Sequence, residues 1–266
     1  MNTTTLLLHG LCSTPDELLP VQAALQRAGH RVLALRVPGY SYAGETGVAT
    51  PFTSWLRSVA LAVREQRRHG RRVVLAGLSA GAALALGTAQ QRGAAPDALV
   101  LMSTTLRYDG WAVPPWHRLL PLALYTPLGR LWRYRERPPY GVKNPRVRQW
   151  VAHELATRRI SSAGAAVIGV PHLREHDRLR RLVTRRLAAF ACPPVLALHA
   201  CDDEVAGPAN VALLQARLST PSFRAVLLPD SHHMITIDND RQQVAREIVA
   251  FVDAVAAAPA NPFQPA

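Results

Sequence analysis

The chain has 266 residues, of which 48% are hydrophobic and 18% are charged, and its formal net charge at pH 7 is +13. This length and apolar content predict a folded protein with one sizeable core and exclude a disordered chain. The sequence has no apolar run long enough to span a membrane and lacks the features of a secretory signal, so we expect a cytoplasmic protein.

Short apolar segments alternate with segments of helical spacing along most of the chain. The pattern predicts strands at 4–8, 30–37, 73–76, 97–103, 194–199 and 223–228. It predicts helices at 14–28, 52–68, 80–92, 208–218 and 241–256. Strands separated by helices of this length form parallel sheets with helices on both faces, so the predicted fold class is α/β with a doubly wound, six-stranded sheet.

Residues 105–186 interrupt this alternation. The segment is rich in Trp, Pro and Arg, and it opens and closes between predicted core strands. We therefore expect an α/β core formed by residues 1–104 and 187–256, with an inserted cap at 105–186. The Ala- and Pro-rich segment 257–266 is expected to be a disordered tail.

The positive charge is concentrated in the predicted cap, where 17 Lys and Arg stand against 5 Asp and Glu, a net charge of +12. Of the 31 basic residues in the chain, 30 are Arg, so compositional bias is one explanation. The other is an anionic partner, such as an acyl carrier or a membrane surface. No nucleic-acid-binding motif is visible, so nucleic acid is not an expected partner.

A strand, a sharp turn and a helix meet at the sequence Gly77-Leu78-Ser79-Ala80-Gly81. Such a turn forces its central residue into strained backbone space and needs small neighbours on both sides. It exposes the hydroxyl of Ser79 above the sheet and places the N–H of Ala80 at a helix N-terminus. Ser79 is therefore the predicted nucleophile.

A serine nucleophile needs a base, an acid that orients the base, and donors for the oxyanion. Loops at the carboxyl ends of predicted strands supply such residues, in the order serine, acid, histidine. The acid is Asp202 or Asp203, and the base is His232 or His233.

With these motifs in this order, the chain resembles the α/β-hydrolase superfamily, above all its carboxylesterase and monoacylglycerol lipase group. The matching segments are LLLHGL at 6–11, GLSAG at 77–81, DDEV at 202–205 and SHHMITID at 231–238. The resemblance implies that Asp203, in a D-x-V pattern, and His233, in an S-x-H pattern, complete a triad with Ser79. It also implies that the N–H groups of Leu11 and Ala80 form the oxyanion hole.

The aromatic and leucine side chains of the cap have two explanations. We expect both to apply: they form the core of the cap itself and also line a pocket for an acyl chain, with Trp111, Trp116 and Leu120 as substrate-binding candidates. His172 and His176 have helical spacing without a third ligand nearby, so no metal site is predicted. The cysteines Cys12, Cys192 and Cys201 lack metal-binding spacing and are expected to be free thiols.

The resulting functional hypothesis is a serine hydrolase that cleaves carboxylic esters of medium or long acyl chains, without a cofactor. The first alternative is a thioesterase that acts on acyl groups carried by coenzyme A or an acyl carrier protein, which would explain the basic cap. Two others stay open: a peptidase on the same fold, and a binding module without activity.

Overall fold

The structure, a computed structural model, describes residues 2–44, 47–127, 129 and 132–259. Six parallel strands form its central sheet in the order β10-β9-β4-β3-β1-β2. These strands are β1 (Thr3–Leu8), β2 (Arg31–Ala34), β3 (Arg72–Leu78), β4 (Ala98–Met102), β9 (Val195–Ala200) and β10 (Phe223–Leu228). The predicted fold class is therefore confirmed.

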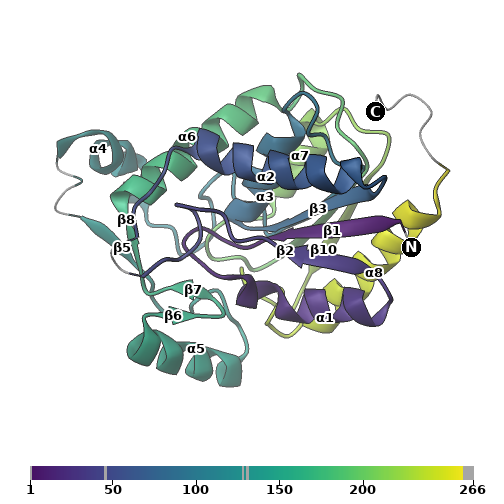
Figure 1. Cartoon of the computed structure of the whole chain (residues 1–266). Coiled ribbons are helices and arrows are strands. Elements are labelled where there is room, and N and C mark those ends of the chain that lie inside the picture. Colours follow the sequence, from purple (N-terminus) through teal and green to yellow (C-terminus); the bar gives the residue numbers. More distant parts are fainter. Residues whose placement is uncertain (1, 45–46, 128, 130–131, 260–266) are drawn as a thin grey trace.

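Helices cover both faces of this sheet (Figure 1). They are α1 (Leu19–Arg27), α2 (Phe52–Arg68), α3 (Ala80–Ala89), α6 (Val170–Arg186), α7 (Ala209–Arg217) and α8 (Arg241–Ala257), with the short 3₁₀-helix η1 (Pro15–Leu18) before α1. In Figure 1, α2, α3, α6 and α7 lie on one side of the sheet, and α1 and α8 lie on the other. This arrangement explains why the central strands read as continuous apolar runs, since both of their faces are buried.

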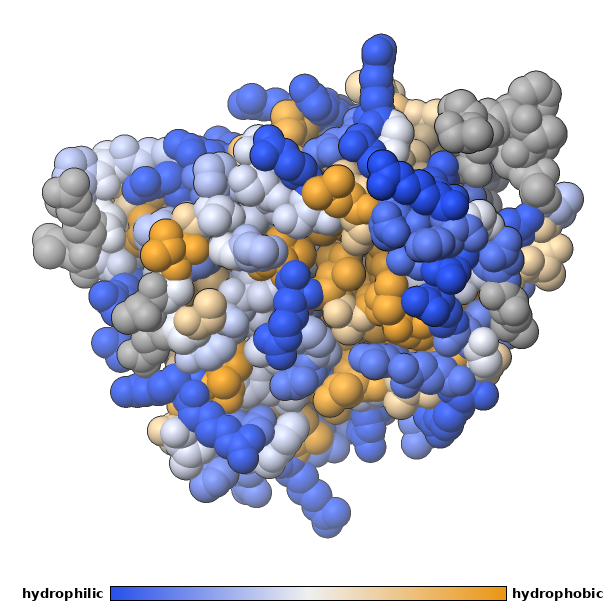
Figure 2. All heavy atoms as spheres, viewed as in Figure 1, coloured by the Kyte–Doolittle hydropathy of each residue, from blue (hydrophilic) through white to orange (hydrophobic). Residues whose placement is uncertain are grey.

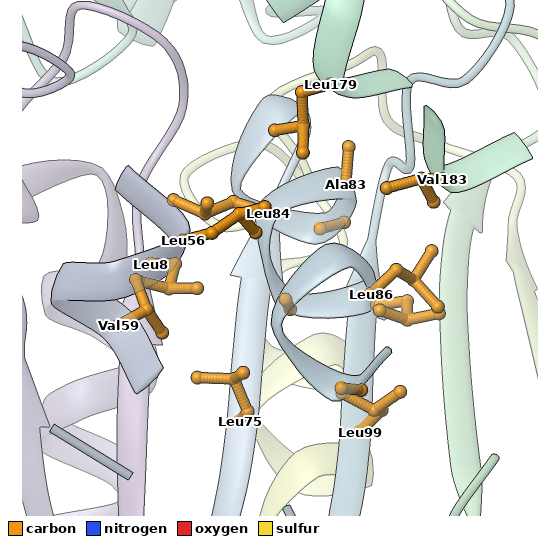
Figure 3. Close-up of a cluster of buried hydrophobic side chains, with 14 of the residues drawn as sticks. Leu8, Leu56, Val59, Leu75, Ala83, Leu84, Leu86, Leu99, Leu179 and Val183 are labelled. Atoms are coloured by element: carbon orange, nitrogen blue, oxygen red, sulfur yellow. The ribbon is translucent and has the colours of Figure 1, made fainter. Parts of the chain in front are cut away.

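The helix α3 lies at the centre of one face, and every one of its residues is buried. Figure 3 shows Leu84 and Leu86 of this helix among leucines from the strands below and from α2 and α6 beside it. A helix that is apolar on all sides is stable only in such a buried position. Since α3 begins immediately after Ser79, this packing also anchors the turn that carries the predicted nucleophile.

The insertion between β4 and β9 holds the remaining elements. They are η2 (Pro115–Leu119), α4 (Leu120–Tyr125), β5 (Arg133–Arg135), α5 (Pro145–Arg158), β6 (Ile160–Ser161), β7 (Gly164–Ala165) and β8 (Val167–Gly169). Figure 1 shows them at the side of the sheet opposite the N-terminus. Because β1 runs away from the N-terminus, the cap covers the carboxyl ends of the strands.

The predicted cap boundary at residue 186 differs from the structure. Leu179 and Val183 of α6 are fully buried and belong to the same apolar cluster as Leu84 of α3. By its packing α6 is therefore a core helix, and the cap ends before Val170. The reason is that the apolar face of α6 covers α3, which the sequence pattern alone does not reveal.

The cap has no large aromatic core of its own among its described residues. Trp111, Trp116 and Trp150 are exposed, whereas the buried Val142 and Val151 join the apolar cluster on the second face of the sheet. The expectation that the cap aromatics form an internal core is thus wrong for Trp111 and Trp116.

The predicted tail begins one residue too early, because α8 extends to Ala257. Residues 260–266 of this segment lie outside the described residues. Within the described ranges, no helix combines the length and the apolar character needed to cross a membrane.

The packing of α6 leads to a stability prediction. Leu179→Ala removes a fully buried side chain and should lower the free energy of unfolding by about 3 kcal/mol. The matched change Leu122→Ala, at an exposed position of α4, should cost less than about 0.5 kcal/mol. Urea unfolding of both variants measures the difference, and equal losses would contradict the assignment of α6 to the core.

Candidate active site

The turn at Ser79 has the strained geometry expected of a nucleophile elbow. Ser79 has φ 56° and ψ −117°, a region that side-chain-bearing residues rarely adopt. The turn closes because Gly77 and Gly81 lack side chains. A Cβ at Gly77 would run into the backbone of Gly81, and one at Gly81 would run into the backbone of Leu8 and His9. The glycine spacing read in the sequence is therefore a packing requirement.

Three side chains from distant parts of the chain form a hydrogen-bonded relay. His233 Nε2 lies 2.8 Å from Ser79 Oγ, and His233 Nδ1 lies 2.8 Å and 3.0 Å from the two carboxylate oxygens of Asp203. The carboxylate accepts a hydrogen bond from Nδ1–H, which leaves Nε2 as an acceptor for the serine hydroxyl. This arrangement is able to generate a serine nucleophile.

The acid of the relay is held by its own loop. Asp203 Oδ1 accepts hydrogen bonds from the backbone N–H groups of Val205 and Ala206, both at 2.8 Å. His199 Nε2 lies 3.5 Å from its other oxygen. Burial opposes ionisation of this carboxyl, but His233, His199 and the N–H of Ala206 together outweigh burial and lower the pKa of Asp203 below its usual value. The carboxylate thus stays charged and fixed.

The two neighbouring residues, Asp202 and His232, lie outside the relay. The side chain of Asp202 is half exposed, and its backbone carbonyl accepts a hydrogen bond from His232 Nδ1 at 2.7 Å. The ring of His232 packs edge-on against Trp111. The structure therefore brings together Ser79, Asp203 and His233, and leaves the half-exposed Asp202 and the buried His232 outside the relay.

His233 is surrounded by carboxyl groups. Its backbone N–H donates to Glu204 Oε2 at 3.1 Å, and its backbone carbonyl accepts from Ser103 Oγ at 2.7 Å. Burial alone would lower the pKa of His233, but Asp203, Glu204 and Glu136 raise it to about 9. The neutral imidazole, which is the form that accepts a proton, therefore becomes more abundant as the pH rises toward this value.

The loop that carries Leu11 is the predicted second side of the oxyanion hole. Its N–H group finds no acceptor among the described residues. The N–H of Ala80, the first residue of α3, has no acceptor within the helix, as is usual for a first-turn residue. Both residues line the same cavity as Ser79. The two donors are thus available to a ligand.

The neighbouring residues His9 and Cys12 support this loop without taking part in the relay. His9 Nδ1 donates to the carbonyl of Gly10 at 2.7 Å, and Nε2 lies 2.7 Å from Ser41 Oγ. Burial lowers the pKa of His9 to about 4, so its ring is neutral. Burial also raises the pKa of the Cys12 thiol to about 12, which makes it a poor nucleophile.

Ser79 and His233 open into a cavity of about 820 Å³ between the core and the cap. Much of its wall is apolar, from residues that include Leu11, Val113, Leu119, Leu120, Ala123, Leu124, Ile168, Leu173, Val205 and Met234. Of the three substrate-binding candidates, Trp116 and Leu120 line the cavity. Trp111 is not among its lining residues, because its ring packs against His232 on the outer side.

Several residues of the site carry no signal in the sequence. The hydroxyl of Thr105 lies 3.2 Å from Ser79 Oγ, and the carboxyl groups of Glu17 and Glu136 line the cavity. None of these stands in a recognisable motif, since each reaches the site through tertiary packing. The described residues contain no group of three or more side chains placed to hold a metal ion.

The geometry makes a prediction about the two ambiguous pairs. Asp203→Ala and His233→Ala should each lower kcat by roughly 10³-fold or more, because each removes a member of the relay. Asp202→Ala and His232→Ala are the matched controls and should lower kcat less than about tenfold. Steady-state kinetics on a soluble ester measures all four, and a larger loss in either control would reverse the assignment.

Comparison with known proteins places this geometry in a family. The family model described as serine aminopeptidase, S33, matches residues 2–240. A thermostable monoacylglycerol lipase from Bacillus sp. strain H-257 is 26% identical over 246 residues, which covers 92% of this chain and 88% of the lipase.

Solved structures show the same fold. The monoacylglycerol lipase of Paleococcus ferrophilus superposes with a TM-score of 0.77 at 18% identity, over 95% of this chain and 94% of that one. A thermostable carboxyl esterase from Bacillus coagulans gives a TM-score of 0.71 at 17% identity, over 96% and 90% of the two chains. These matches confirm the resemblance seen in the sequence, and the chain belongs to the S33 serine aminopeptidase family of the α/β-hydrolase superfamily.

Proposed function

We propose that the protein is a serine hydrolase that cleaves carboxylic esters of medium or long acyl chains. The observation that carries this proposal is the relay of Ser79, His233 and Asp203 at the floor of a large cavity. Its relatives named above as a lipase and an esterase support the ester as the bond that is cleaved. No cofactor is needed for this chemistry.

In the first half of the reaction, Ser79 Oγ attacks the ester carbonyl while His233 Nε2 takes its proton. Asp203 holds the Nδ1 proton and stabilises the imidazolium that forms. The N–H groups of Leu11 and Ala80 receive the oxyanion, and each such donor lowers the barrier by about 3 kcal/mol. His233 then protonates the leaving alcohol, and an acyl-enzyme on Ser79 remains.

In the second half, His233 Nε2 takes a proton from water, and the resulting hydroxide attacks the acyl-enzyme carbonyl. The tetrahedral intermediate is held by the same two N–H groups. Its collapse returns the proton from His233 to Ser79 Oγ and releases the carboxylic acid.

The cavity supports an acyl chain as the substrate group. Its volume of about 820 Å³ is ample for a ligand much larger than a short acyl ester. Trp116, Leu119 and Leu120 of the cap contribute apolar surface to its wall. Burial of each methylene group of the chain would favour binding by about 0.8 kcal/mol, so affinity should grow with chain length.

The alternatives are less well supported. The named relatives do not favour a thioesterase. The family description mentions an aminopeptidase, and the same relay is able to attack an amide. A binding module without activity does not account for the complete set of hydrogen bonds between Ser79, His233 and Asp203.

Labelling tests the nucleophile. A fluorophosphonate probe should modify the wild type one-to-one and only at Ser79, because this hydroxyl alone is activated by a histidine relay. Ser79→Ala should abolish labelling, whereas Ser222→Ala, at an exposed position outside the site, should label as the wild type does. Modification of Ser79→Ala at full stoichiometry, measured by mass spectrometry, would contradict the assignment of Ser79 as the nucleophile.

The substrate class is tested on the same protein with matched acyl esters, thioesters and anilides of short, medium and long chains. Esters of medium or long chains should show the highest kcat/KM. A preference for thioesters or anilides at every chain length would replace the ester proposal while leaving the nucleophile in place.

The arginines between residues 105 and 186 differ in how they are engaged. Three of the six arginines of α6 form ion pairs, namely Arg178 with Glu175, and Arg180 and Arg181 with Asp177. Paired charges contribute little to long-range attraction. Arginines without such a pairing are the better candidates for contact with a partner.

Arg133, Arg135 and Arg137 are such residues. They are exposed, and their side chains make no hydrogen bond or ion pair with any described residue. All three line the large cavity, and the first two also line a side cavity of about 380 Å³. Figure 2 shows many hydrophilic side chains projecting from one face of the molecule, with apolar side chains between them. We infer that this row attracts an anionic group on the substrate or its carrier.

Salt dependence tests this part of the proposal. Exposed charges act over about 8 Å at physiological salt, so they change association more than chemistry. Adding salt should lower kcat/KM on an anionic ester roughly tenfold and change hydrolysis of a neutral ester little. The triple change of Arg133, Arg135 and Arg137 to Gln should weaken the salt dependence of kcat/KM on the anionic ester.

The matched control for that experiment changes Arg57, Arg217 and Arg246 to Gln. These arginines are equally exposed but lie on the core helices α2, α7 and α8. An equal effect of both triple variants would show that only net charge matters. Equal salt profiles for neutral and anionic esters would mean that the arginines reflect composition.

A cytoplasmic location completes the proposal. Cys12, Cys192 and Cys201 are free in the structure, and Cys201 is exposed. Free thiols are typical of proteins that work in a reducing compartment.

A further inference from the structure

A buried carboxyl group lies directly beside the loop of the predicted oxyanion hole. The backbone N–H of Gly10 donates to Glu17 Oε2 at 2.6 Å. Glu17 is 2% exposed and lines the cavity together with Gly10, Leu11 and Ser79. A carboxyl group in this position touches the backbone that carries an oxyanion donor.

The other polar backbone groups of this loop are also engaged. The carbonyl of His9 accepts from Tyr40 Oη at 2.6 Å, and the carbonyl of Gly10 accepts from His9 Nδ1 and from the N–H of Ser13. Among the described residues, the N–H of Leu11 is left without an acceptor. The orientation of this one donor therefore depends on the contacts of the residues before it.

Glu17 is itself fixed by its surroundings. Its backbone carbonyl accepts from Thr236 Oγ1 at 2.7 Å, which ties it to the loop that carries His233. On the cap side it faces Gly164, where an added Cβ would lie 3.6 Å from Glu17 Oε1. Glu17 thus joins the oxyanion loop, the histidine loop and the cap hairpin β6–β7.

The absence of a cation beside Glu17 is informative in so basic a chain. No ion pair with a Lys or Arg is found for Glu17 among the described residues, although the chain contains 30 Arg. Burial is the largest influence and raises the pKa of Glu17 to about 7, with Ser13, Gly10 and His233 opposing it and Asp16 adding to it. Burial of an unpaired carboxyl is costly, so a stability role alone does not explain it.

We propose that Glu17 is a positioning residue, which holds the Gly10–Leu11 peptide so that the N–H of Leu11 points at the oxyanion. The inference rests on the proposed function, because it assumes that an oxyanion forms at Ser79. Glu17 does not transfer a proton. Its acceptor oxygen fixes the peptide, and an uncharged acceptor of the same shape would do the same.

The test compares three changes at this position. Glu17→Gln keeps an acceptor oxygen at the same reach and should hold kcat within about threefold of the wild type. Glu17→Asp withdraws the acceptor by one methylene group, and Glu17→Leu removes it. Both should lower kcat by roughly 10- to 100-fold while KM changes less than about twofold, because displacement of an oxyanion donor acts on the transition state.

A second measurement separates positioning from general destabilisation. The affinity for an alkyl boronic acid, which forms a tetrahedral adduct with the serine, should fall in parallel with kcat in Glu17→Asp and Glu17→Leu. The exposed neighbour Asp16→Asn is the matched control and should leave kcat and boronate affinity unchanged. Thermal unfolding identifies any variant that fails to fold. If Glu17→Leu does not fold, the kcat and boronate affinity of Glu17→Asp alone decide the test.

Two results would overturn the inference. One is a Glu17→Asp variant with unchanged kcat and boronate affinity. The other is a Glu17→Gln variant as impaired as Glu17→Leu, which would show that the charge acts rather than the acceptor. Failure of the proposed function looks different, because the wild type itself would then show neither fluorophosphonate labelling nor ester hydrolysis.

Discussion

The strained backbone at Ser79 is the constraint on which the rest of the site depends. A positive φ at a residue with a side chain costs free energy, so the surrounding structure has to hold it in place. Here the fully buried helix α3 and the close contact of Gly77 with Gly81 do so. Because the turn is fixed by the core, the hydroxyl has one position, and every other group of the site is arranged around that position.

The charged groups near His233 are acidic, although the net charge of the chain is positive. Although the protein carries +13, the histidine lies among the carboxyl groups of Asp203, Glu204 and Glu136. These carboxyls favour the imidazolium, which is the form present in the transition state of the proposed reaction. The exposed Arg133, Arg135 and Arg137 line the same cavity, and in the proposed function they act on association instead of on the chemical step. In that proposal, the two signs of charge serve two separate steps.

The cap links these two regions. Trp116, Trp132 and the strand β5 of the cap line the cavity, while the hairpin β6–β7 reaches inward to Glu17. Its buried side chains Val142 and Val151 belong to the apolar cluster on the second face of the sheet. The cap therefore depends on the core for its position, and the shape of the cavity is set where the two meet.

The sequence by itself determined the parallel sheet and the position of Ser79, because alternating apolar periods and the glycine spacing of the turn are local properties. It also narrowed the acid and the base to two adjacent pairs. Tertiary structure alone decided that α6 is part of the core, that Trp111 lies outside the cavity, and that Glu17 touches Gly10. These facts arise from contacts between segments far apart in the chain, and no local pattern of residues encodes which side chain meets which.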